Sequence, residues 1–192
     1  MKFARTQYLR CHHLARQANL SNQLAMDANP TTTDGQTKKL TATAFHEAGH
    51  AVMAVSLGRT VHKVTVKPGG SQFGPAHAGR CLLDGRSKAS KNALEDEVLI
   101  LFAGMVAESH FTDAYCPNGA AEDLRMIRQL LCQRAGSPSQ HERMHRRLLD
   151  KTEHILADEG HAKAVQAIAN ELEKRITVSG RAVRHLFQQS VQ

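Results

Sequence analysis

The segment at residues 44–58, AFHEAGHAVMAVSLG, constrains the fold of this chain more than any other part of it. Its side chains are small or apolar, except for the ionisable residues His46, Glu47 and His50 and the hydroxyl of Ser56. Its length and composition predict a buried helix. Buried histidines need hydrogen-bonding or ionic partners, because an unpaired polar group costs free energy inside a protein. The rest of the fold must therefore supply partners for this pair.

Capping residues set the expected ends of this helix. Thr41 or Thr43 can cap its start, and Gly58 can adopt the left-handed turn that closes it. The preceding residues 27–39, DANPTTTDGQTKK, are polar and show no apolar period, which predicts a linker. We therefore predict a basic N-terminal arm and polar linker over residues 1–39 and one folded domain over residues 40–192.

The remaining segments predict an α+β domain that is mainly α-helical, with a small sheet next to the histidine-bearing helix. Residues 61–66, VHKVTV, alternate as a strand does, and a second candidate strand covers residues 79–83. Helical patterns are expected from Ser90 through the buried run 98–107, over 120–132, over 140–173 with a break at Gly160, and after Gly180.

Composition narrows the class of protein further. The cysteines form no CxxC pair, which favours a reducing compartment, and we expect a cytoplasmic location. The longest apolar run has about half the roughly 20 residues that a membrane-spanning helix needs, so no membrane span is expected. The net charge is +7, but no nucleic-acid-binding module is recognisable, so we expect no nucleic-acid partner. The cysteines are Cys11, Cys81, Cys116 and Cys132.

The HEAGH spacing predicts metal chemistry. Residues four apart in a helix lie about 6 Å apart along the axis and about 40° around it, so His46 and His50 can bind one ion. Glu47 can then reach a water bound to that ion and act as the general base. Zinc lowers the pKa of a bound water to roughly 7 and polarises a carbonyl, so peptide hydrolysis is the expected reaction.

A second literal match, HERMH at residues 141–145, shows that the motif alone does not define a site. This copy contains one arginine and is followed by two more, Arg146 and Arg147, which would repel a divalent cation. We interpret it as a solvated helix face. The apolar surroundings of HEAGH favour the first copy as the metal site.

A catalytic site with two histidines needs a third protein ligand and an open position for water. Asp123 is a candidate, because it shares a helical stripe with Ile127 and Leu130, and a carboxylate on an apolar face needs a compensating charge. A structural role for Asp123, either pairing with an arginine or capping a turn, would satisfy the carboxylate equally well, and the spacing does not decide between this role and metal binding. Glu108, at the end of the buried helix, is another candidate ligand or supporting carboxylate.

Taken together, these residues resemble the peptidase domain of the FtsH-type ATP-dependent zinc metalloproteases. The segments that carry the resemblance are TATAFHEAGHAV, then VHKVTVKPGG directly after the helix, then FAGMVAE and NGAAEDL. The last two are similar to the Gly-x-x-Ala-Glu and Gly-Ala-x-x-Asp-Leu segments of that family. Their order and separations also resemble those of the family, over about three quarters of the chain.

The resemblance implies a zincin-like, mainly helical domain that binds one Zn²⁺ through His46, His50 and Asp123, with Glu47 as the base. It also implies that extended polypeptide substrate pairs with an edge strand beside the site. It further implies a possible AAA+ ATPase partner and possible assembly into homo-oligomers. The segment in the place of that edge strand comprises Gly79, Arg80, Cys81, Leu82 and Leu83.

The sequence departs from the family pattern in two ways. It has no glycine-rich phosphate-binding loop, so we expect an endopeptidase that acts without ATP on unfolded or flexible polypeptides. Glu122 and Asn118 stand where the family often has a small or amide residue and a threonine, respectively. The alternative is a non-catalytic peptide-binding or adaptor module that keeps the fold.

Overall fold

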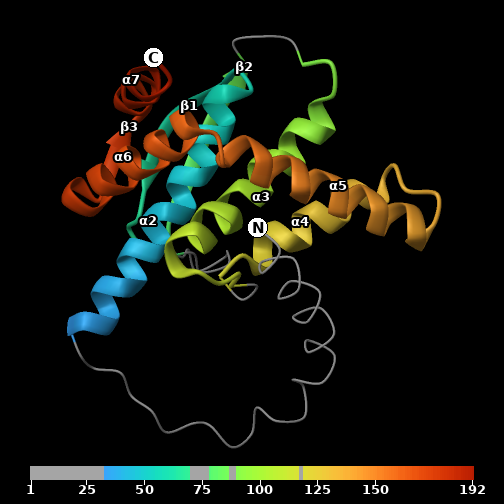
Figure 1. Ribbon diagram of the computed structural model, residues 1–192, viewed down its shortest axis with the longest axis horizontal. Coiled ribbons are helices and arrows are strands. Elements are labelled where there is room, and N and C mark those ends of the chain that lie inside the picture. Colours follow the sequence, from blue (N-terminus) through green and yellow to red (C-terminus); the bar gives the residue numbers. More distant parts are fainter. Residues whose placement is uncertain (1–32, 70–77, 87–89, 117–118) are drawn as a thin grey trace, which may run out of the picture. The chain divides into compact units, whose positions relative to one another are not determined.

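The computed structural model describes residues 33–69, 78–86, 90–116 and 119–192 (Figure 1). The chain divides into two compact units, Met1–Lys38 and Lys39–Gln192. The first 32 residues of the predicted arm lie outside the described part, and its assignment stays a prediction. The second unit contains the site, and its architecture is described below.

Helix α2 (Thr33–Ser56) carries the HEAGH segment and begins earlier than predicted. Thr41 and Thr43 lie inside the helix, and the Thr43 hydroxyl donates to the carbonyl of Lys39 at 2.9 Å instead of capping a terminus. The linker prediction is therefore wrong for residues 33–39, because a polar segment without proline continues a helix that later residues anchor. The predicted end is confirmed, since Gly58 has a φ of 73°.

Helix α3 (Ala93–Thr112) is the central packing helix, as its apolar sequence predicts. The Asn92 side chain caps its start by accepting from the amide of Glu95, two residues after the expected start at Ser90. Residues 98–109 are all buried. Gly49 of α2 meets this helix so closely that a Cβ atom there would lie 2.3 Å from the carbonyl oxygen of Ala103. The two backbones therefore touch where the site is built.

A three-stranded antiparallel sheet, in the order β2-β1-β3, accompanies the helices. Strands β1 (Arg59–Thr65) and β2 (Arg80–Arg86) confirm the two predicted strands. The third, β3 (Thr177–Ser179), was not predicted, because three residues are too few to show an alternating pattern. Strand β2 pairs with β1 along one side, so it forms an edge of the sheet.

The other helices follow the predicted order with shifted boundaries. Helix α4 (Ala121–Cys132) precedes α5 (Pro138–Leu156), which begins two residues before the predicted start at residue 140. The predicted break at Gly160 is misplaced, because Asp158 accepts from the amides of Gly160 and His161 and thereby caps the next helix. That helix is α6 (Glu159–Arg175), and α7 (Gly180–Ser190) follows as predicted and packs on β1.

The fold class is therefore confirmed as a mainly α-helical α+β domain with a small sheet. Of the described helices, none combines the length and the hydropathy that crossing a bilayer would require. The hydrophobic core is mostly aliphatic and lies between α2, α3, α5, α6 and the inner face of the sheet.

Replacing Gly49 with alanine tests the contact between α2 and α3. The new methyl would lie 2.3 Å from the Ala103 carbonyl oxygen and 2.6 Å from the Ala107 Cβ, and both belong to a rigid helix. We expect the free energy of unfolding to fall by at least about 2 kcal/mol, measured by urea denaturation. Gly136→Ala is the matched control, because its nearest neighbour, Gln140 Oε1, is 3.4 Å away. Equal stabilities for the two variants would contradict the close packing.

Candidate functional site

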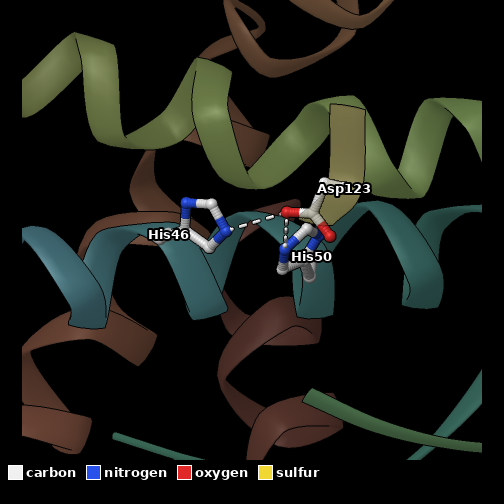
Figure 2. A group of neighbouring side chains, drawn as sticks. All are labelled: His46, His50 and Asp123. Carbon is white, nitrogen blue, oxygen red and sulfur yellow. Dashed lines mark hydrogen bonds and ion pairs between the residues drawn. The ribbon is translucent and has the colours of Figure 1, made fainter. Parts of the chain in front are cut away.

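His46 and His50 project from the same face of α2 toward Asp123, which comes from α4 (Figure 2). One carboxylate oxygen, Asp123 Oδ2, lies 3.1 Å from His46 Nε2 and 3.3 Å from His50 Nε2. Both histidines are buried. The fold thus brings together the three residues that the sequence proposed as ligands, although Asp123 follows His46 by 77 positions in the chain.

The other ring nitrogens are held by α3. His46 Nδ1 lies 3.0 Å from Glu108 Oε2, and His50 Nδ1 donates to the carbonyl oxygen of Ile100 at 2.7 Å. A carbonyl oxygen only accepts, so the proton of a neutral His50 is on Nδ1. These bonds orient both rings and leave both Nε2 atoms as the donors available to a metal ion. Of the two roles predicted for Glu108, this contact favours the supporting carboxylate.

Glu47 lies on the side of α2 that faces the start of β2. It is buried, with 6% of its surface exposed. A Cβ atom on Gly79 would lie 2.7 Å from Glu47 Cγ and 2.8 Å from Glu47 Oε1. The strand therefore reaches the proposed base by backbone contact, and glycine is needed at this position.

These residues line a cleft of about 710 Å³. Gly79, Arg80, Cys81 and Leu83 of the predicted substrate strand are among its lining residues, together with the three candidate ligands and Glu47. Leu82 is not among them, because side chains alternate along a strand and its neighbours point into the cleft. Burial, together with the nearby charge of Glu47, raises the pKa of the Cys81 thiol, which keeps it protonated.

Opposite effects determine the pKa values of His46 and Asp123. Burial alone would lower the pKa of His46, but hydrogen bonds to Asp123 and Glu108 outweigh it and raise that pKa to about 10. Burial also opposes charge on Asp123, yet the two histidines hold the pKa of its carboxyl well below the usual range. Without a metal, a histidine proton thus balances the Asp123 carboxylate, which is the electrostatic task that a bound cation would perform.

The donor set fits zinc. Two imidazole nitrogens and one carboxylate oxygen, all within 4.8 Å of one another, are ligand types that catalytic zinc sites use. In the part of the chain that the structure describes, this is the single group of three such side chains.

The second motif is arranged differently. The rings of His141 and His145 are 6.4 Å apart, and His145 packs edge-on against Phe102 of α3. These histidines are half-buried, so the interpretation as a solvated helix face is wrong for them. Contact with Phe102 of α3 accounts for the burial of His145.

Two departures from the family pattern remain to be placed. Glu122 lines the cleft but is exposed and pairs with Arg125 one turn later, so its charge is partly neutralised away from Asp123. Asn118 lies outside the described residues.

Sequence reasoning missed the close contact of Gly104 in α3 with the histidine rings, because no pattern of side chains marks it.

A buried helix bearing His-Glu-x-x-His, with a carboxylate from a second helix and an edge strand alongside, defines a metallopeptidase fold. Comparison with known families agrees, since residues 32–176 match Peptidase family M41. The chain belongs to this family.

Known relatives confirm the resemblance to FtsH-type peptidase domains. The ATP-dependent zinc metalloprotease FtsH of Cupriavidus metallidurans is 44% identical over 89 residues, 43% of this chain and 12% of that relative. The FtsH of Magnetococcus marinus is 36% identical over 101 residues, 50% of this chain and 15% of the relative. The FtsH of Chlamydia trachomatis is 32% identical over 108 residues, which are 52% of this chain and 11% of the relative. The chain therefore matches a small part of the length of these relatives.

The raised pKa of His46 predicts how the metal-free fold responds to pH. A proton on His46 stabilises the fold fully below the unfolded pKa of 6.5, and this contribution is lost as the pH rises toward about 10. We expect the parent chain to have a larger free energy of unfolding than His46→Gln at low pH, and this difference to shrink as the pH rises across the range. Urea denaturation with a chelator present measures it. A difference between the two chains that does not change with pH would contradict the coupling.

Proposed function

We propose that this chain is a zinc-dependent endopeptidase that hydrolyses unfolded or flexible polypeptides, and that the isolated chain does so without ATP. The observation that carries the proposal is the convergence of His46 Nε2, His50 Nε2 and Asp123 Oδ2 in a buried position that opens onto a cleft. Family membership supports the reaction class, and the printed names of the relatives support zinc.

In this proposal His46, His50 and Asp123 hold one Zn²⁺ per chain. The ion supplies a lowered pKa for a coordinated water and polarisation of the substrate carbonyl. Glu108 and the Ile100 carbonyl keep the two imidazole rings in the orientation that presents Nε2, so neither ring has to rotate when the site fills.

Glu47 is the proposed general base. It neighbours His46 in α2, it lines the cleft, and β2 begins against its side chain. From this position its carboxylate accepts a proton from the attacking water and passes it to the departing amine. Burial strengthens its interaction with a nearby cation, since screening by solvent is weak there.

Among the described strands none pairs with the other side of β2, and this side is the proposed binding place for the substrate. Main-chain hydrogen bonds to an edge strand select for extended backbone and tolerate many side chains. A folded domain cannot offer such a segment, so substrates must be unfolded or flexible. Folded substrates would need an unfolding partner, and the words "ATP-dependent" in the relatives' names favour an AAA+ ATPase in that role, with self-association as a further proposal.

Zinc binding and cleavage should be measured on the same sample of the parent chain and of Asp123→Ala. We expect one zinc per parent chain, cleavage of unfolded casein without ATP, and zinc affinity reduced by more than about 100-fold in Asp123→Ala, since even outer-shell changes cost about 10–100-fold. Glu122→Ala, which removes the neighbouring exposed carboxylate, is the matched control and should keep both properties. Zinc without cleavage in the parent would instead support a non-catalytic peptide-binding module.

Glu47→Gln separates metal binding from catalysis. The substitution keeps the shape of the side chain and removes its basicity, so zinc content should not change while cleavage falls by at least about 100-fold. The readouts are zinc per chain and the initial rate on unfolded casein. Cleavage at the parental rate would eliminate Glu47 as the base.

Gly79→Ala tests the contact between β2 and the base. The new methyl would displace Glu47, because it would lie within 2.8 Å of Oε1. We expect parental zinc affinity and a rate reduced by more than about 10-fold, since displacements near 1 Å can cost 100-fold. Leu82→Ala, in the strand that follows Gly79 but outside the cleft lining, should cleave normally. A fully active Gly79→Ala chain would refute this placement.

A further inference from the structure

The backbone of α3 makes a very close approach to the histidine pair at Gly104. A Cβ atom on this residue would lie 2.5 Å from His50 Nε2, 2.6 Å from His50 Cε1 and 2.7 Å from His46 Nε2. Real Cβ atoms essentially never come within 3.0 Å of such neighbours. Gly104 has no positive φ, so this contact, rather than backbone conformation, requires a glycine here.

The rings have no free direction in which to avoid such a side chain. His46 Nδ1 is held at 3.0 Å from Glu108 Oε2, and His50 Nδ1 donates to the Ile100 carbonyl at 2.7 Å. Both partners belong to α3, the same helix as Gly104. Swinging either ring away from α3 would therefore break the bond that orients it.

We propose that Gly104 is a positioning residue that forms one wall of the metal pocket, and that its lack of a side chain leaves the space the ion needs. The inference rests on the proposed function, because it concerns the same zinc site. Zinc binds histidine nitrogen at about 2.0–2.1 Å, and a methyl 2.5 and 2.7 Å from the two Nε2 atoms would compete for nearly that space. The α3 backbone also closes this side, so water and peptide must enter from the cleft.

Gly104 therefore differs in role from Gly49, which lies in the same helix contact. The Cβ of residue 49 would meet backbone and Cβ atoms of α3, so that glycine sets the spacing of the helices. The Cβ of residue 104 would meet ring atoms of the two proposed ligands. Loss of the first disturbs packing, whereas loss of the second removes room for the ion without changing any ligand.

Zinc affinity provides the first test, measured by competition with a chromogenic chelator on the full chain. We expect Gly104→Ala to bind zinc at least about 100-fold more weakly than the parent. Gly119→Ala is the matched control in the same cleft, because its methyl would meet Cys116 Sγ and Glu108 Oε1 at ordinary distances of 3.4 and 3.6 Å. It should bind zinc like the parent. Parental affinity in a folded Gly104→Ala chain would overturn the proposal.

A metal-free double-mutant cycle keeps the test valid if Gly104→Ala is unstable. In a His46→Ala/His50→Ala background the ring atoms that would clash are gone, so the loss of melting temperature caused by Gly104→Ala should largely disappear. An equal loss in both backgrounds would assign Gly104 to helix packing and overturn the proposal. A parent that binds no zinc would overturn the proposed function and, with it, the proposed role of Gly104. Zinc bound equally by the parent and by Gly104→Ala would overturn only the role of Gly104.

Discussion

The close contact between α2 and α3 is the constraint on which the site depends. Because Gly49 lets the two backbones touch, the Ile100 carbonyl and the Glu108 carboxylate come within hydrogen-bond distance of the two histidine rings. A wider separation would leave both Nδ1 atoms without partners and both rings free to rotate. The orientation of the proposed ligands therefore follows from helix packing, and small residues at the contact are part of the chemistry.

The sequence predicted the parts of the site that have a local pattern. His46, Glu47 and His50 are spaced for one helix face, and their apolar neighbours require burial, so both the helix and its need for partners were foreseeable. For Asp123, metal binding and a structural role were equally good interpretations until the resemblance of the chain to a known family was considered. An ion pair and a metal ligand place the same demand on a carboxylate, and periodicity cannot distinguish them.

Other features could not be predicted, because tertiary contacts determine them. Helix α2 begins at Thr33, since a polar segment takes its structure from the anchored residues that follow, and β3 exists only because β1 offers a pairing edge. The two HExxH copies show the same dependence. HEAGH gains a carboxylate from α4 and two partners from α3, whereas the second copy packs His145 against Phe102. Identical spacing therefore produces different environments.

The third proposed ligand stands on a lightly anchored element. In the described structure, α4 buries only Ile127 and Leu131 along its length, while α3 is buried over a dozen consecutive residues. Asp123 is thus the link by which a bound ion would tie α4 to α2. Metal binding and the docking of α4 would then be thermodynamically coupled, so that each stabilises the other. A bound ion would therefore hold α4 in place as well as complete the catalytic centre.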